Sequence, residues 1–188
     1  ALQEEIQGPA QVLVGFSGGL DSSVLLDLLA QTIPSNRITA VHVNHGLSPQ
    51  APEWQAHAER FCQSRGIACH SERVDVKLDG EGPEAAARKV RYAVFEKLLR
   101  PDGILLLGHH QDDQSETLLY RLMRSSGPVG LSGIPAMRSL GAGRLFRPLL
   151  SWPKEALQAY ALNKNIEWVE DASNSTNDYD RNFLRNRL

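Results

Sequence analysis

Residues 11–23 of the chain read QVLVGFSGGLDSS, an apolar run that passes through two glycines into a polar turn. The first six residues are apolar and rich in β-forming side chains, which favours a buried strand. After the turn, apolar residues recur at helical spacing up to Leu29. A loop between a strand and a helix places successive backbone N–H groups at the helix N-terminus, where they bind anions. The stretch therefore predicts a phosphate-binding strand–loop–helix unit.

The loop carries a carboxylate, Asp21, inside the expected anion cradle. A carboxylate would repel phosphate unless it holds Mg²⁺ against the phosphate oxygens. The alternative is that Asp21 caps the N-terminus of the following helix. The glycine spacing matches neither the Walker loop nor the dinucleotide fingerprint, so the loop belongs to another class. The residues that we expect to contact the anion are Ser17, Gly18, Gly19, Leu20, Asp21, Ser22 and Ser23.

Apolar strands and amphipathic helices alternate beyond the loop. Strands are expected at 37–44, 67–76, 104–107 and 145–150, and helices at 52–65, 83–99, 112–124 and 153–165. Repeated βα units predict a parallel sheet that is covered by helices on both faces. We therefore expect a three-layer α/β domain with a mostly parallel, five-stranded sheet. Ligands of such sheets bind at the carboxyl ends of the strands.

The last third of the chain differs in composition from the part before it. Residues 125–144 are rich in Gly, Ser and Pro and predict a long loop. Residues 179–188 predict the start of a basic helix. We therefore expect one domain over 1–188, with its core at about 11–124 and a loop and basic segment at 125–188.

Charge is distributed unevenly, although the net charge is only −2. Residues 1–120 hold 10 basic and 16 acidic side chains, whereas residues 121–188 hold 10 basic and 6 acidic ones. A polyanionic partner should therefore meet the C-terminal third. No apolar run has the roughly 18 residues that a membrane span needs, and two cysteines do not make a disulfide framework. These features favour a reduced, cytoplasmic, globular protein without a membrane partner.

Residues 17–22, SGGLDS, resemble the signature of the PP-loop ATP pyrophosphatases, which cleave ATP between its α- and β-phosphates. Four later motifs narrow this resemblance: VHVNHGL at 41–47, EAAARKVRY at 84–92, GHHQDDQSET at 108–117 and DRNFLRN at 180–186. In this order, the five motifs resemble the N-terminal catalytic domain of the tRNA(Ile)-lysidine synthetases. The resemblance runs from about Gln11 to Leu188, and it implies a PP-loop, adenine nucleotide α-hydrolase-like fold.

The resemblance implies an ATP-dependent ligation. Enzymes of this family adenylate carbon two of the wobble cytidine in the minor isoleucine tRNA, whose anticodon is CAU. The amine of L-lysine then displaces AMP, so the products are lysidine, AMP and pyrophosphate. By the same resemblance we expect ATP as a substrate, Mg²⁺ as the metal, and strand groups of Val41, His42 and Val43 at the adenine edge. Family members continue into tRNA-binding domains, which we expect this chain to lack, and the sequence leaves a homodimer open.

Carboxylates and histidines gather directly after the strand expected at 104–107. Carboxylates at such a strand end can share Mg²⁺ with phosphates or receive a cationic amine, although acids also offset a helix dipole. We expect Asp21 and Asp113 to hold the metal, and Asp112 and Glu116 to be the candidates for the lysine ammonium. His109 is expected either to stabilise charge on the α-phosphate or to deprotonate the attacking amine, because an unshifted histidine pKa lies near neutrality.

Two pairs of arginines are further candidates. Arg88 and Arg91 are three residues apart on one expected helix, and the resemblance places an arginine here on the nucleotide or the target base, with Arg91 the better match. Arg181 and Arg185 are four apart, on one helical face, and the resemblance puts them on the tRNA-facing side. An arginine can neutralise transition-state charge or stack on a base. The alternative for all four is ordinary surface charge.

Other classes of function are less consistent with the residues. His42 and His45 lie three apart on a strand, so they point to opposite faces and argue against a zinc site. A tRNA thiolase of the same superfamily needs a reactive cysteine near the site. Cys62 and Cys69 fall inside an expected helix and strand, away from the carboxyl ends. A non-catalytic ATP-binding module leaves the acids and His109 unexplained.

Overall fold

Six strands form one sheet, in the order β3-β2-β1-β4-β6-β5, in the computed structural model, which describes residues 5–6, 8, 11–77, 82–123 and 132–170. The expected α/β class and mostly parallel sheet are confirmed, but these residues form one strand more than the five expected. The strands are β1 (Val12–Gly15), β2 (Ile38–Asn44), β3 (Ala68–Arg73), β4 (Ile104–Leu106), β5 (Met137–Leu140) and β6 (Gly143–Phe146).

The additional strand, β5, lies in the segment 125–144, for which the sequence predicts a loop. It pairs antiparallel with β6, with Met137 opposite Phe146. Gly141 makes the turn between them with a φ of 51°, a left-handed conformation that glycine adopts without steric cost. A four-residue strand beside glycines has too few residues for a clear alternating pattern. Its stability comes from pairing with β6, which no local pattern reveals.

β1 occupies the centre of the sheet. It runs parallel to β2 on one side and to β4 on the other, so that Val12 lies opposite both Ile38 and Ile104. β6 runs parallel to β4 on the side away from β1. The chain therefore adds β2 and β3 on one side of β1, and then adds β4, β6 and β5 on the other side. In sheets of this kind, the crevice at the carboxyl ends beside such a reversal binds the ligand.

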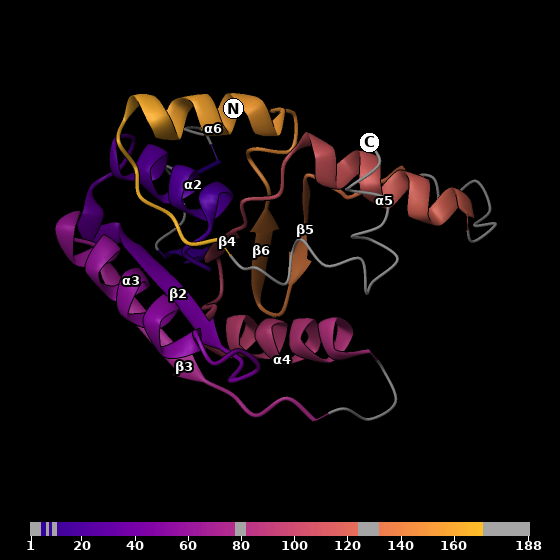
Figure 1. Cartoon of the computed structure of the whole chain (residues 1–188), viewed down its shortest axis with the longest axis horizontal. Coiled ribbons are helices and arrows are strands. Elements are labelled where there is room, and N and C mark those ends of the chain that lie inside the picture. Colours follow the sequence, from indigo (N-terminus) through magenta and orange to yellow (C-terminus); the bar gives the residue numbers. More distant parts are fainter. Residues whose placement is uncertain (1–4, 7, 9–10, 78–81, 124–131, 171–188) are drawn as a thin grey trace.

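Helices cover both faces of the sheet, as expected (Figure 1). Side chains of β1 alternate between them: Val12 and Val14 belong to the apolar cluster of one face, and Leu13 to that of the other. Each helix begins and ends within two residues of its expected bounds. α2 (Leu20–Ala30), α3 (Ala51–Ser64) and α6 (Lys154–Asn163) pack on one face, α4 (Pro83–Leu98) packs on the other, and α5 (Gln111–Met123) follows β4.

Two further expectations from the sequence concern the C-terminal helix and membrane-spanning helices. The basic helix expected at 179–188 lies outside the described residues. No helix among the residues that the structure describes is long and apolar enough to cross a membrane.

Gly108 follows β4 and packs against the first turn of α2. A Cβ atom at this position would lie 3.0 Å from the carbonyl carbon and oxygen of Asp21 and 3.1 Å from the backbone nitrogen of Ser22. These neighbours are backbone atoms, which cannot turn aside as a flexible side chain can. Glycine at 108 therefore lets the end of β4 approach the loop that follows β1.

We predict that Gly108→Ala lowers the free energy of unfolding by about 1–3 kcal/mol, because the added methyl group overpacks against backbone. Urea denaturation measures this change. Gly82→Ala is the matched control, since a Cβ at Gly82 would meet no atom within 4 Å. Equal losses in the two variants would contradict the close-packing argument.

Candidate functional site

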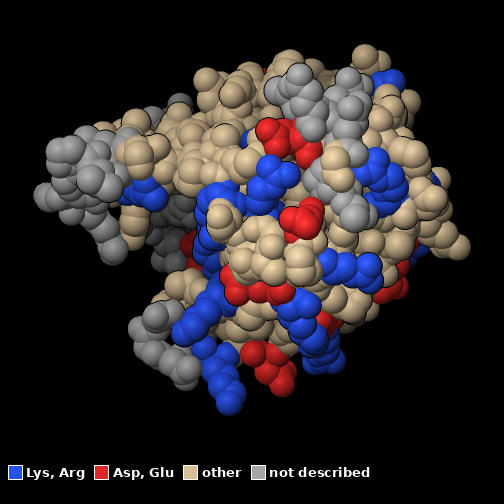
Figure 2. Space-filling model, turned by 180° about the vertical axis from the view of Figure 1, so that it is seen from behind, with Lys and Arg blue, Asp and Glu red and all other residues tan. Residues whose placement is uncertain are grey.

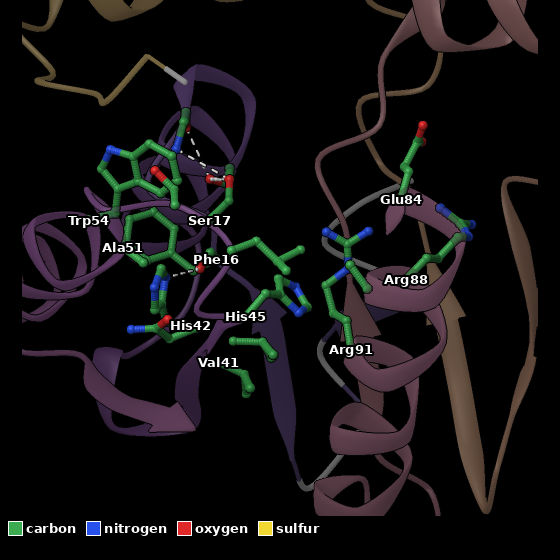
Figure 3. A pocket seen from close by; sticks show the side chains of 18 of the residues that line it. Phe16, Ser17, Val41, His42, His45, Ala51, Trp54, Glu84, Arg88 and Arg91 are labelled. Atoms are coloured by element: carbon green, nitrogen blue, oxygen red, sulfur yellow. Dashed lines mark hydrogen bonds between the residues drawn. The ribbon is translucent and has the colours of Figure 1, made fainter. Parts of the chain in front are cut away.

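A cavity of about 970 Å³ lies at the carboxyl ends of β1, β2 and β4. Figure 3 shows Phe16, Ser17 and Trp54 on one side of it, and Glu84, Arg88 and Arg91 of α4 on the other. The sequence-predicted residues that line it are Ser17, Gly19, Asp21, Ser22, Val41, His42, Val43, Arg88, Arg91, His109, Asp113 and Glu116. Gly18, Leu20, Ser23 and Asp112 are not in the lining, and Arg181 and Arg185 lie outside the described residues.

The loop between β1 and α2 is held in shape by its own serines. Ser22 Oγ donates to Gly19 O at 3.0 Å, and Ser17 Oγ lies 3.1 Å from Ser22 Oγ. Ser23 is fully buried and donates to Gly18 O at 3.3 Å, so it stabilises the loop from its buried side. Gly18 has a φ of 85°. The cap of α2 is Gly19, without a side-chain hydrogen bond, so the interpretation of Asp21 as a helix cap is wrong.

Asp21 and Asp113 come from different strand ends and converge on one histidine. His110 is buried, and its Nε2 lies 3.7 Å from an Oδ2 of each carboxylate. Its Nδ1 accepts the backbone N–H of Asp112 at 3.3 Å, which leaves Nε2 as the ring nitrogen that faces the two acids. Asp113 also accepts the backbone N–H of His110 at 2.9 Å. Two carboxylates at the mouth of an anion-binding loop are a donor set that suits Mg²⁺ shared with phosphates.

Asp112 and Glu116, the two candidates for an ammonium group, are placed differently. Glu116 is buried and lines the cavity. Asp112 is turned toward α6, where its Oδ1 accepts the backbone N–H of Lys154 at 3.4 Å. Asp112 is therefore outside the lining of the cavity, although the same Oδ1 lies 3.7 Å from His110 Nδ1; its expected role toward the lysine ammonium stays a prediction.

His109 lines the cavity beside a buried arginine that the sequence analysis did not select. Arg147 Nε donates to His109 Nδ1 at 3.3 Å. Burial, followed by the positive charges of Arg147, Arg88 and Arg91, lowers the pKa of His109 to about 4, despite the opposing effect of Asp113. The premise of an unshifted pKa is therefore wrong, and His109 is neutral at pH 7. Of its two expected roles, this geometry favours hydrogen-bond donation over proton abstraction.

The cationic wall of the cavity comes from α4. Figure 3 shows Arg91 extending from α4 toward His45. The pKa of Arg91 is lowered by burial and then by Arg88, so this charge is costly to leave without an anion. Arg88 extends along the helix instead: its guanidinium lies 4.9 Å from the ring centre of Tyr92 and donates to the Tyr92 hydroxyl at 3.2 Å. Both arginines line the cavity; Arg91 is half-buried, whereas Arg88 is an exposed residue.

β2 presents both backbone and side-chain groups to the cavity. Val41 O accepts the backbone N–H of Phe16 at 2.9 Å, the last bond toward β1. Since backbone groups alternate along a strand, the N–H and C=O of Val43 point the same way, beyond the end of β1. His42 Nδ1 lies 3.0 Å from Phe16 O, whereas His45 faces Arg91. The two histidines do not converge, and no group of three metal-binding side chains occurs among the described residues.

Among the residues that the sequence analysis did not select, three bear on the chemistry of this site. Trp54 lines the cavity from α3, where a lone aromatic residue gives no signal of a site. His110 was expected only as part of a motif, without a role. Arg147 had a detectable signal, because a charge interrupts the apolar run LFRPLL at 145–150.

The fold and the cavity define a phosphate-binding α/β domain with a glycine-rich loop beside two carboxylates. A family model described as the PP-loop domain matches residues 1–188. The chain belongs to this PP-loop domain family, which confirms the first of the two resemblances drawn from the sequence.

The chain is also similar in sequence to individual curated proteins. The chain is 48% identical over 187 residues to the tRNA(Ile)-lysidine synthase of Alkalilimnicola ehrlichii and 45% identical over 186 residues to that of Pseudomonas fluorescens. These alignments cover 97% and 96% of this chain, but only 42% and 41% of the relatives. The chain thus spans about two fifths of the length of the curated relatives that it matches.

Solved structures support the fold. A U34-tRNA thiolase from Methanococcus maripaludis superposes with a TM-score of 0.69 at 20% identity, covering 97% of this chain and 67% of the thiolase. An NH3-dependent NAD synthetase from Campylobacter jejuni superposes with a TM-score of 0.60 at 18% identity, covering 88% of this chain and 69% of the synthetase. At these identities the likeness shows the fold alone.

We predict that stability falls as the pH is lowered through the range in which the buried histidines titrate. Burial first, and then Arg91, lowers the pKa of His45 to about 4, the value that His109 also has. Between pH 6.5 and 4 the unfolded chain therefore binds about two protons more than the native chain through these residues, so the free energy of unfolding decreases with decreasing pH. Urea denaturation at intervals from pH 7 to 4 measures the slope. His109→Gln should make it shallower, and an unchanged slope would contradict the assignment.

Proposed function

We propose that this chain is the ATP-binding catalytic part of an enzyme that joins lysine to carbon two of the wobble cytidine in the minor isoleucine tRNA. ATP would first adenylate the cytidine with release of pyrophosphate, and the lysine amine would then displace AMP. The single observation that carries the proposal is the convergence of Asp21 and Asp113 at the mouth of the glycine-rich loop. The names of the relatives, which are 43–48% identical, supply the tRNA and the lysidine product.

The chain's own groups suit the binding of a nucleoside triphosphate. Backbone N–H groups of the loop and the N-terminus of α2 would bind the phosphates. Asp21 and Asp113 would hold Mg²⁺, which neutralises phosphate charge and so favours departure of pyrophosphate. Val43 would offer its backbone N–H and C=O to the adenine edge, and Trp54 supplies an apolar surface at the same end of the cavity.

Other residues of the cavity suit the α-phosphate and the ammonium group of lysine. Arg91, which is half-buried and whose pKa is lowered by burial, would stabilise negative charge on the α-phosphate as the adenylate forms. His109 would donate a hydrogen bond to the same group. Glu116 is the buried carboxylate in the lining that remains for the lysine ammonium once Asp21 and Asp113 hold the metal.

Two rival functions are less well supported. The fold resembles that of a tRNA thiolase, but neither cysteine of this chain lines the cavity: Cys62 is a buried core residue of α3, and Cys69 lies within β3. A non-catalytic ATP-binding module does not require a pair of acids held together by a buried histidine. That rival predicts ATP binding without the formation of AMP under any combination of substrates.

The reaction is tested with the full-length protein, ATP, Mg²⁺, labelled lysine and a transcript of the minor isoleucine tRNA. We expect label to enter the RNA with one AMP and one pyrophosphate for each lysine, and no label in a transcript with uridine at the wobble position. Asp21→Asn and Asp113→Asn should each reduce incorporation by at least about 100-fold, because the metal loses a charged ligand. ADP in place of AMP would refute the proposed bond cleavage.

Asp112→Asn is the matched control for these acid variants. It removes a carboxylate charge from the same helix turn as Asp113, but from a side chain outside the cavity lining, whose Oδ1 lies near Lys154 N and His110 Nδ1. We expect it to retain activity within about threefold of the wild type, since the asparagine amide oxygen can still accept the Lys154 N–H and no metal ligand is lost. Equal loss in Asp112→Asn and Asp113→Asn would show that the two acids are not distinguished as the geometry predicts.

Glu116→Gln tests the lysine subsite. A neutral amide cannot compensate an ammonium charge, so we predict that the KM for lysine rises about tenfold or more while the KM for ATP stays within about twofold. Steady-state kinetics with each substrate varied in turn measure the two constants. A parallel rise in both would place Glu116 at the nucleotide instead.

A further inference from the structure

Arg147 is a buried charge that the proposed mechanism does not use. Its side chain is 3% exposed, and no carboxylate forms an ion pair with it among the residues that the structure describes. Its position is set on both sides by backbone: Nη1 donates to Pro135 O at 2.7 Å, and its own N–H donates to Ala136 O at 2.8 Å. A guanidinium held this firmly without a counter-ion needs a structural or functional reason.

A further donor of Arg147, its Nε–H, bears on that reason. Its Nε–H points at His109 Nδ1, 3.3 Å away. β4 and β6 are neighbours, with Leu106 opposite Phe146, so the residues that follow the two strands meet at the cavity. Arg147 therefore reaches the site through His109, whose ring lies in the lining, and also donates to Tyr92, a second residue of the lining.

A guanidinium donates hydrogen bonds and accepts none. Nδ1 of His109 must therefore present a lone pair to Arg147, which excludes both the Nδ1–H tautomer and the doubly protonated ring. The proton of the neutral ring is then on Nε2. This nitrogen has no hydrogen-bond partner among the described residues, and it is the ring's one polar group left for a ligand in the cavity.

We propose that Arg147 is a positioning residue that holds His109 as its neutral Nε2–H tautomer, so that the ring always presents a hydrogen-bond donor to an anionic group of the substrate. The inference rests on the proposed function for the identity of that group, the α-phosphate, but the tautomer itself does not depend on the function. Arg147 acts in the way that an aspartate orients a catalytic histidine, except that it donates to the ring and thereby selects the opposite tautomer.

The tautomer is measured directly by long-range ¹H–¹⁵N NMR of this chain labelled with ¹⁵N-histidine, with His109→Gln used to assign the signal. At pH 7 we expect His109 Nε2 to carry the proton and Nδ1 to be unprotonated. In Arg147→Met the ring should exchange between tautomers. Arg144→Met is the matched control, because Arg144 is an exposed residue of β6 that pairs with Glu5 at 3.5 Å. A wild-type ring that is protonated on Nδ1 would overturn the inference without any variant.

A double-mutant cycle in the full-length enzyme tests whether Arg147 acts through His109. Glutamine at 109 retains an N–H donor but has no tautomer to select. Arg147→Met should lower kcat for lysine incorporation at least about tenfold in the wild type, and by less than about twofold in the His109→Gln background. Circular dichroism of each variant checks the fold. Equal losses in the two backgrounds would show that Arg147 acts independently and would overturn the inference.

The two experiments separate this inference from the proposed function. If the wild type fails to incorporate lysine, the proposed function is wrong, yet the NMR spectrum still decides the tautomer. If lysine is incorporated but the cycle shows no coupling, the function stands and the role of Arg147 is refuted.

Discussion

The approach of β4 to the loop after β1 is the constraint on which the site depends. Gly108 lies against the backbone of Asp21, at a distance that any side chain at 108 would increase. This contact brings the motif after β4 next to the glycine-rich loop, although 87 residues of chain separate Asp21 from Gly108 in sequence. It also places His110 where its ring can lie between Asp21 and Asp113. Two acids that would repel each other are thereby kept at the mouth of an anion-binding loop.

The cavity combines desolvation with an excess of positive charge on one wall. Burial, and then the charges of Arg147, Arg88 and Arg91, lower the pKa of His109 to about 4, so the imidazole is neutral at pH 7. Figure 2 shows the surface from behind the view of Figure 1, where Lys and Arg side chains lie among the acids on a mixed-charge face. In the cavity, Arg88 and Arg91 both belong to the wall that α4 forms. A triphosphate with bound Mg²⁺ is the kind of ligand that balances one wall of arginines and another of carboxylates.

Much of the fold could be predicted from the sequence, because its information is local. The apolar run before Ser17 and the helical spacing after Asp21 define the first βα unit, and the same alternation recurs three times. β5 could not be predicted, since Met137–Leu140 is stable only through pairing with β6. The contact of Asp112 with α6 and the lowered pKa of His109 could not be predicted either. Asp112 is adjacent to Asp113 in sequence, and only the packed start of α6 turns one away and leaves the other in the cavity.

By itself, the sequence determined the class of fold, the glycine-rich loop between β1 and α2, and most of the polar residues that meet around it. These depend on periodicity and on glycine positions, which are properties of short segments. The tertiary structure alone decided which acids face the cavity, that His110 joins two of them, and that Arg147 lies against His109. Such pairings depend on strand order and on burial. A hydrogen bond between residues 38 apart, and a pKa set by desolvation and distant charges, have no counterpart in any local pattern.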